Sequence, residues 1–258
     1  MFIAQVSEDR LRTRSMRYPI SESMFYCPGL SPGVDGATVD GEEARHILTS
    51  RRLKVGDAIW LFDGRGTVGR ATIVAREGRT RTLRVQVHER EFIPLARPYV
   101  ELACALPKGD RQAVLLDMAT QLGMTGFRPL LCERSIVRPG PQAARRWQRI
   151  CLEACKQSRR PHLPAIHAEL TPAQTVALAG SDCTVWVADQ EGMPLPGRPL
   201  PEKEQLLIMV GPEGGFTDAE MTSITESGAE VISLGTGVLR VETAAIALLS
   251  HIMLAHSF

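Results

Sequence analysis

Two short glycine-containing loops near the C-terminus constrain the fold of this chain more than any other feature. They occupy residues 210–216, the first glycine loop, and 234–240, the second glycine loop. Each follows an apolar run, at 206–210 and 231–234, and apolar runs without alternation are typical of buried parallel strands. Because each loop also precedes a segment with helical spacing, the tail is predicted to alternate strands and helices. That alternation indicates an α/β fold with a parallel sheet.

The helices that follow the loops carry start and stop signals. Thr217 and Glu220 have the spacing of a capping box, and Gly228 is a typical C-terminal stop. The last helix is predicted to run from residue 241 to the end of the chain. Ligands of open parallel sheets bind beyond the carboxyl ends of the strands, where such loops lie side by side. The two loops therefore predict a ligand site.

The residues of these loops favour one class of ligand. Glycine removes the side chain where a ligand must approach the backbone closely. Neither loop carries the Gly-Lys-Ser/Thr ending of a phosphate-binding loop or the dinucleotide fingerprint, and Glu213 would repel a triphosphate. A cofactor with an adenosine but no phosphates fits better. The alternative is that the glycines only make tight turns, but two such loops, followed by Arg240 and Glu242, favour the ligand site.

Two motifs in these loops resemble one enzyme family. Residues 211–220 read Gly-Pro-Glu-Gly-Gly-Phe-Thr-Asp-Ala-Glu, and residues 234–244 read Leu-Gly-Thr-Gly-Val-Leu-Arg-Val-Glu-Thr-Ala. Both are similar to the ribosomal RNA small-subunit methyltransferase E family, of the SPOUT class of S-adenosylmethionine enzymes. The resemblance implies an S-adenosyl-L-methionine-dependent rRNA (uracil-N3-)-methyltransferase. Its substrate would be a uridine of 16S rRNA in the small ribosomal subunit, near the decoding site.

The resemblance also implies a fold and an assembly. The C-terminal part is expected to be an α/β domain, a SPOUT-type parallel sheet with a deep trefoil knot, at 99–258. The N-terminal part is expected to be a PUA-like β-barrel that binds RNA, at 16–93. Residues 1–15 are expected to be an extension, because Met16 opens a motif similar to the family's usual start. Knotted methyltransferases usually build each site from two subunits, so a homodimer is expected; alternatively, the apolar face of the last helix packs within one chain.

Charge divides the chain near the same boundary. Residues 1–98 hold 16 Lys/Arg and 12 Asp/Glu, whereas residues 99–258 hold 14 and 17. A basic N-terminal part suits a phosphate-backbone partner, although a solvated surface would have the same charge. No apolar run approaches the roughly 20 residues of a membrane span, and the first 15 residues hold no apolar signal core. Neither a membrane segment nor a secretory peptide is expected.

The six cysteines favour a reduced, cytoplasmic protein. No pair has the C-x-x-C spacing, and four lie in apolar strand or helix patterns, where a reduced cysteine acts as a small hydrophobe. Cys151, Cys155 and His162 match no common zinc-site spacing, so no metal is expected.

Residues 20–93 are predicted to form a β-rich unit. The predicted elements are a short helix at 42–48 and strands at 58–62, 69–75 and 83–87. The stretch 46–66 resembles the family's PUA-like barrel, whose Arg-Leu-Lys-x-Gly-Asp segment lies in a domain that grips RNA. The expected RNA contacts there are Arg51, Arg52 and Lys54. A solvated entry to the next strand is the alternative for each.

From residue 99 the pattern alternates between strands and helices. The predicted strands are 100–106, 128–132 and 183–188, and the predicted helices are 109–122 and 141–157. Further matches to the family lie at 106–111, 133–135 and 153–159. Positively charged residues in or beside these motifs are also expected to bind RNA. They are Lys108, Arg111, Arg134, Arg159 and Arg160.

The resemblance assigns the cofactor contacts to three loops. The end of the predicted strand 183–188 is expected to form the third loop, beside the two glycine loops. The expected cofactor-binding residues are Val187, Ala188, Val210, Gly211, Pro212, Glu213, Gly214, Gly215, Leu234, Gly235, Val238, Leu239, Arg240 and Thr243. The chain departs from the family at Thr236-Gly237, where Pro-Arg is usual, and at Val241, where Thr is usual.

The expected chemistry is methyl transfer from a sulfonium to a uracil nitrogen that must lose its proton. Arg240 would stabilise negative charge on the uracil carbonyls. Glu242 or Glu213 would take the proton, or Glu242 would only orient Arg240. The expected catalytic residues are therefore Arg240 and Glu242. Two other functions stay open: a ribose 2′-O-methyltransferase of the same class, whose usual Ser-Leu-Asn signature is absent here, and a non-catalytic ribosome-binding protein.

Overall fold

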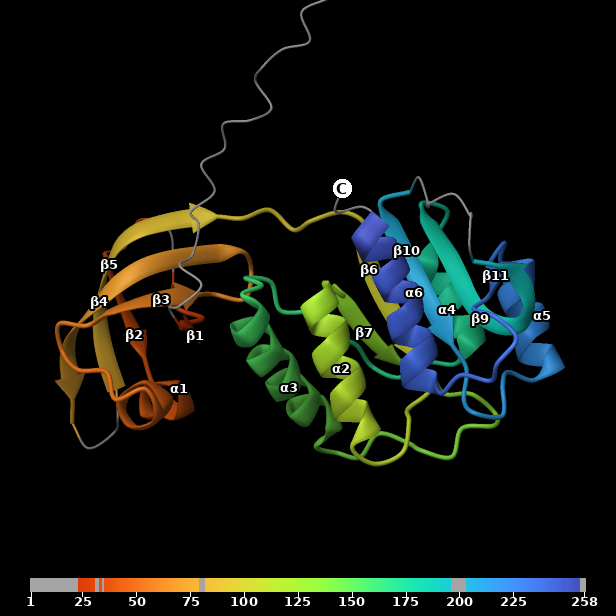
Figure 1. Cartoon of the computed structure of the whole chain (residues 1–258), viewed down its shortest axis with the longest axis horizontal. Coiled ribbons are helices and arrows are strands. Elements are labelled where there is room, and N and C mark those ends of the chain that lie inside the picture. The colour runs from red at the N-terminus through yellow and green to blue at the C-terminus, as the bar shows by residue number, and fades with distance from the viewer. Residues whose placement is uncertain (1–22, 31–32, 34, 79–81, 196–202, 256–258) are drawn as a thin grey trace, which may run out of the picture. The chain divides into compact units, whose positions relative to one another are not determined.

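The computed structural model describes residues 23–30, 33, 35–78, 82–195 and 203–255 of the 258-residue chain. The expected extension at 1–15 and the motif at Met16 lie outside the described residues. The chain forms two compact units (Figure 1). Of the described residues, the first unit contains those up to Phe62 together with those of Thr67–Phe92, and the second contains Asp63–Gly66 and those from Ile93 onward.

The first unit is built on a five-stranded sheet. Its strands, in spatial order, are β1 (Met24–Tyr26), β3 (Ala58–Phe62), β4 (Thr67–Glu77), β5 (Thr82–Phe92) and β2 (Gly36–Val39). All neighbours are antiparallel except the parallel pair β1–β3. The long strands β4 and β5 shift register twice against each other, which bends the sheet around a core that contains Phe25, Ile47, Leu61 and Leu83.

The predicted helix at 42–48 forms as two short pieces. The α-helix α1 (Gly41–Arg45) continues directly into the π-helical turn η2 (His46–Ser50), in which the Arg51 N–H donates to the His46 carbonyl at 3.1 Å. Arg52 then adopts a left-handed φ of 56° and the helix ends. Side-chain periodicity does not distinguish a π turn from an α turn over so few residues, so the sequence indicated the helix but not this geometry.

The second unit is a six-stranded parallel sheet with helices on both faces. Its strands, in spatial order, are β11 (Glu230–Ser233), β9 (Cys183–Pro194), β10 (Gln205–Val210), β6 (Tyr99–Cys104), β7 (Gly126–Pro129) and β8 (Ala165–Ile166). The helices are α2 (Arg111–Leu122), α3 (Ala143–Ser158), α4 (Pro172–Ala179), α5 (Asp218–Glu226) and α6 (Val241–Ala255).

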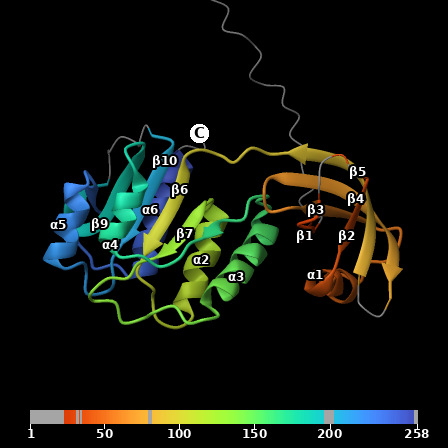
Figure 2. The ribbon, with the colours of Figure 1, turned by 180° about the vertical axis from the view of Figure 1, so that it is seen from behind.

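Alternating side chains of the central strands pack against different helices. On β6, Leu102 joins the apolar cluster of α2, α3 and α6, whereas Ala103 joins the cluster of α4 and α5. Figure 1 shows the first group of helices on the near face of the sheet, and Figure 2, from behind, shows α4 and α5 on the other face. This double cover explains why the strands are apolar at nearly every position.

Most of the predicted α/β elements lie within two residues of their expected bounds. The strand expected at 128–132 is an exception, because β7 begins at Gly126 and ends at Pro129. Beyond it, Leu130 makes only an isolated bridge to Leu170. The short elements β1, β2, β8 and α4 were not predicted. None of the described helices is long and apolar enough to cross a membrane.

Strand β9 differs most from expectation, because it continues to Pro194 instead of ending at residue 188. Strand β11 pairs with it in two separate places: Val231 lies opposite Val187, and the next residue, Ile232, lies opposite Met193. Residues 188–192 therefore form a bulge between two paired segments. A Cβ at Gly192 would lie 2.7 Å from backbone atoms of Val231 and Ile232, so the close approach of the strands requires glycine there.

Candidate active site

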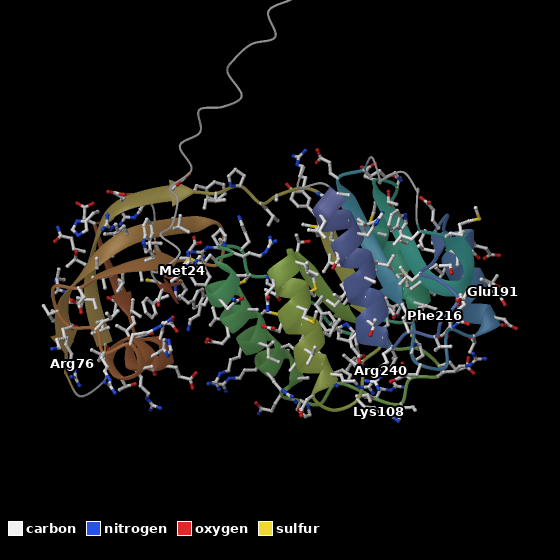
Figure 3. The ribbon with its side chains drawn as sticks, viewed as in Figure 1. Met24, Arg76, Lys108, Glu191, Phe216 and Arg240 are labelled. Atoms are coloured by element: carbon white, nitrogen blue, oxygen red, sulfur yellow. The ribbon has the colours of Figure 1, made fainter. Side chains whose placement is uncertain are left out.

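A cavity of about 350 Å³ lies at the carboxyl ends of β9, β10 and β11. Four segments form its walls: the β9 bulge, the two glycine loops and the first turn of α6. The lining residues are Ala188, Asp189, Gln190, Glu191, Val210, Gly211, Pro212, Glu213, Gly214, Gly215, Phe216, Ile232, Leu234, Gly235, Gly237, Val238, Leu239, Val241 and Ala244. Figure 3 marks Glu191, Phe216 and Arg240 at this end of the unit.

The first glycine loop uses its glycines in different ways. Gly215 has a φ of 70° and donates its N–H to the Pro212 carbonyl at 2.8 Å, which closes a tight turn. A Cβ at Gly211 would lie 3.0 Å from the buried ring of Phe216, so this glycine makes room for an internal side chain. Gly214 would meet only Arg134, at 3.4 Å. Turn formation thus accounts for Gly215, and Gly214 leaves open backbone at the cavity.

The predicted capping box fixes the exit from this loop and is confirmed. The Thr217 N–H donates to Glu220 Oε2 at 2.9 Å, and the Glu220 N–H donates to Thr217 Oγ1 at 3.3 Å. The other oxygen of Glu220 accepts the Glu133 N–H at 2.8 Å. A single carboxylate therefore ties the start of α5 to the segment that follows β7.

The second glycine loop is exposed along most of its length. Gly235 has a φ of 124°, and Val238 is 82% exposed. The loop then enters α6, whose first residue, Val241, is buried and lines the cavity. Arg240 and Glu242 therefore lie on either side of a cavity residue.

Arg111 connects the first glycine loop with α6. Its Nη2 lies 3.3 Å from Glu213 Oε1, and its Nη1 lies 3.6 Å from Glu242 Oε1. Its Nε donates to the Lys108 carbonyl at 3.3 Å. The side chain of Glu242 is only 13% exposed, and its Oε2 is buried without a hydrogen-bond partner among the described residues.

Arg134 holds the same loop from another direction. Its Nη1 donates to the Gly214 carbonyl at 2.8 Å and to the Phe216 carbonyl at 3.2 Å. Arg111 and Arg134, both expected to contact RNA, thus have partners inside the second unit. Their RNA contacts stay a prediction.

The cavity gathers most of the residues expected to bind the cofactor. Those that line it are Ala188, Val210, Gly211, Pro212, Glu213, Gly214, Gly215, Leu234, Gly235, Val238 and Leu239, whereas Val187, Arg240 and Thr243 do not. Further lining residues were not predicted: Asp189, Gln190, Glu191, Phe216, Ile232, Gly237, Val241 and Ala244. The two carboxylates of the β9 bulge could have been found from their position just after a predicted strand.

The two expected catalytic residues differ in environment. Arg240 is exposed, and among the described residues it makes no ion pair, whereas Glu242 is nearly buried and pairs with Arg111. Among the described residues, neither a hydrogen bond nor an ion pair joins the side chains of Arg240 and Glu242. The option that Glu242 orients Arg240 stays a prediction.

The remaining candidates for RNA contact lie at exposed or helix-end positions. Arg51, Arg52 and Lys54 are exposed in the first unit, and Lys108 is exposed in the second. Arg159 ends α3 with a left-handed φ of 59°. Arg160 donates from Nε to the Gln121 carbonyl at 2.7 Å, and its burial lowers the pKa of the guanidinium.

The cysteines are all free thiols. Burial raises the pKa of Cys132 and of Cys155 to about 12, and raises the pKa of Cys104 as well. These thiols stay protonated at neutral pH and do not act as nucleophiles. Among the described residues, no group of three or more His, Cys, Asp or Glu side chains is arranged to hold a metal.

Two family models match the chain. An RNA methyltransferase domain matches residues 95–253, and an RNA methyltransferase PUA domain matches residues 39–85. The first match covers the whole parallel sheet and its helices up to Met253 in α6, and the second covers much of the five-stranded sheet of the first unit.

Relatives and solved structures agree with these matches. A ribosomal RNA small subunit methyltransferase E from Synechocystis sp. is 37% identical over 83% of this chain and 72% of the relative. One from Mycobacterium bovis is 30% identical over 86% of this chain and 87% of the relative. The crystal structure of the Neisseria gonorrhoeae enzyme of that name, bound to S-adenosyl methionine, superposes with a TM-score of 0.80 at 28% identity and covers 91% of this chain and 98% of that chain. The chain belongs to the ribosomal RNA small subunit methyltransferase E family.

Proposed function

We propose that the protein transfers a methyl group from S-adenosyl-L-methionine to N3 of a uridine in 16S rRNA of the small ribosomal subunit. The observation that carries the proposal is the cavity at the carboxyl ends of three adjacent parallel strands, formed by the two glycine loops and the β9 bulge. Membership of the family supports it, because a member from Neisseria gonorrhoeae was solved with S-adenosyl methionine bound.

The cavity suits this cofactor better than a nucleotide with phosphates. Its volume of about 350 Å³ falls within the range of ligand pockets. Among the described residues that line it, none is basic, and three are acidic: Asp189, Glu191 and Glu213. Carboxylates favour the positive charges of a sulfonium and an amino group and disfavour phosphates. Residues proposed to hold the cofactor are those expected from the sequence that line the cavity.

Arg240 and Glu242 are the proposed catalytic residues. The bound cofactor supplies the activated methyl group. Both residues flank Val241, which lines the cavity, so they lie near the place where a uracil would meet that methyl group. Arg240 would stabilise the negative charge that develops on the uracil carbonyls. Glu242 would accept the N3 proton on its buried oxygen, which has no hydrogen-bond partner among the described residues.

The proposal includes the finer architecture of the family. Residues 16–93 would form a PUA-like β-barrel that grips RNA, and residues 99–258 a SPOUT methyltransferase domain with a deep trefoil knot. Two copies would form a homodimer, and the ribosomal substrate implies a cytoplasmic location. The two family-model matches support the two domains. The exposed apolar side chain of Val238, at the cavity, supports a partner subunit there.

A methylation assay tests the proposal. The purified chain is incubated with isotopically labelled cofactor and with small ribosomal subunits that lack the mark, and the rRNA is digested and analysed by mass spectrometry. We expect one labelled methyl group on the base of one uridine. Label on a ribose 2′-oxygen would instead identify a ribose methyltransferase, and cofactor binding without any transfer would identify a non-catalytic binding protein.

A further inference from the structure

Arg111 bridges two carboxylates that come from distant parts of the chain. Glu213 lies in the first glycine loop, 102 residues after Arg111, and Glu242 lies in the first turn of α6. A third contact, from Nε to the Lys108 carbonyl, fixes the guanidinium against the backbone before α2. Because a guanidinium presents its donors in a rigid fork, one arginine can hold both carboxylates in a defined arrangement.

The bridge places a net negative charge at the cavity. One guanidinium and two carboxylates sum to a charge of −1, and Glu213 lines the cavity itself. The side chains of Arg111, Glu242 and Glu213 are 29%, 13% and 41% exposed, so solvent screens Glu213 the most and Glu242 the least. Without Arg111 the two carboxylates would face each other unpaired, and their repulsion would favour displacement of the first glycine loop.

We propose that Arg111 is a positioning residue: it holds the Glu213 carboxylate at the cavity, where that carboxylate distinguishes the cofactor from its product, which lacks the sulfonium charge. This inference rests on the proposed function. Methyl transfer converts a sulfonium into a neutral thioether, so a nearby carboxylate attracts the cofactor more than the product. The network therefore favours release of spent cofactor and its replacement.

Calorimetric titration of purified variants with S-adenosylmethionine and with S-adenosylhomocysteine tests both the discrimination by Glu213 and the positioning role of Arg111. Glu213→Gln keeps the shape of the side chain and removes its charge, so we expect weaker cofactor binding with product binding nearly unchanged. Arg111→Ala releases the loop, so we expect both affinities to fall about fivefold or more. Arg111→Lys should recover only part of this loss, because a point charge does not reproduce the fork.

A matched control separates this role from a general effect of charge. Arg146 lies 3.8 Å from Asp110, the neighbour of Arg111 in sequence, and both side chains are exposed. Arg146→Ala removes the same charge without touching Glu213 or Glu242, and should leave both affinities unchanged. Thermal unfolding of each variant shows that it is folded. Equal affinities in Arg111→Ala and the unaltered chain, or an equal change for both ligands in Glu213→Gln, would overturn the inference.

The same titrations separate this inference from the proposed function. If the unaltered chain does not bind S-adenosylmethionine, the proposed function fails and the inference fails with it. If the unaltered chain binds the cofactor and the variants behave like it, only the inference fails.

Discussion

At the scale of single residues, the two proposed catalytic side chains, Arg240 and Glu242, differ in how they are held. Arg240 is exposed at the end of the second glycine loop and makes no ion pair within the described part of the chain, whereas Glu242 is held by Arg111. An exposed arginine is available to an incoming base, and a held carboxylate can accept a proton without reorganising. The pairing of Glu242 could not be predicted from the sequence, because it depends on Arg111, more than a hundred residues earlier in the chain.

Arg240→Ala should mainly slow methyl transfer. Loss of one group that stabilises developing charge typically lowers the rate by about a hundredfold. Cofactor affinity should change much less, since Arg240 does not line the cavity. Arg240→Lys should recover part of the rate. Single-turnover methylation of unmodified small subunits, with a parallel cofactor titration, measures both quantities. A variant that transfers methyl at the normal rate but binds cofactor poorly would show that Arg240 binds the cofactor and does not act in catalysis.

Cys155 should make the folded chain less stable as the pH rises. Burial raises the pKa of its thiol from 9.0 to about 12, so above about pH 9 the unfolded chain loses a proton that the folded chain keeps. Its contribution to stability is therefore complete below about pH 9 and is lost as the pH rises toward 12. Urea unfolding gives the free energy of unfolding at about pH 8 and at about pH 10. Its decrease between the two pH values should be smaller for Cys155→Ala than for the unaltered chain. Equal decreases would exclude this role of the thiol.

At the scale of elements, the sequence indicated the order of strands and helices but not their irregularities. Apolar runs and capping signals placed β10, α5 and the start of α6 within a residue or two, because these signals are local. Strand β9 was predicted to end at residue 188, where the bulge begins. Beyond that residue it pairs only with β11, and this long-range pairing is not visible in the sequence. That bulge supplies Asp189 and Glu191 to the cavity, and neither was predicted, although both closely follow the predicted strand 183–188.

Gly192→Val should destabilise the second unit and weaken cofactor binding. The added side chain would press on the backbone of Val231 and Ile232, and such overpacking typically costs about 1–3 kcal/mol. Cofactor affinity should fall as well, because the bulge forms one wall of the cavity. Gly140→Val is a control, since a Cβ there meets no atom within 4 Å. Urea unfolding and cofactor titration measure the two effects, and equal stability of both variants would contradict the close approach.

At the scale of the whole molecule, the sequence indicated the α/β class, and the family matches support a PUA domain before a methyltransferase domain. The spatial order of the six parallel strands could not be predicted from periodicity, because it depends on long-range pairing. The expected RNA contacts of the first unit, in the segment after η2, are exposed.

The basic segment of the first unit should contribute to RNA binding through its charge. If Arg51, Arg52 and Lys54 contact phosphates, replacing all three by alanine should reduce the salt dependence of RNA binding by roughly one unit of slope per charge. Arg84→Ala, at an exposed arginine 3.3 Å from Glu77, is a control in the same unit. Filter binding to small subunits over a range of salt concentrations gives the slopes. An unchanged slope in the triple variant would mean that this segment is only a solvated surface.

Mass mapping of 16S rRNA from cells shows directly whether the protein methylates a uridine base. Ribosomes are compared from a strain that lacks the gene, from its parent and from the same strain carrying the gene for the Arg240→Ala variant. We expect one methyl group on the base of a single uridine to be present in the parent, absent in the deletion strain and restored only poorly by the variant. An unchanged methylation map in the deletion strain would contradict it.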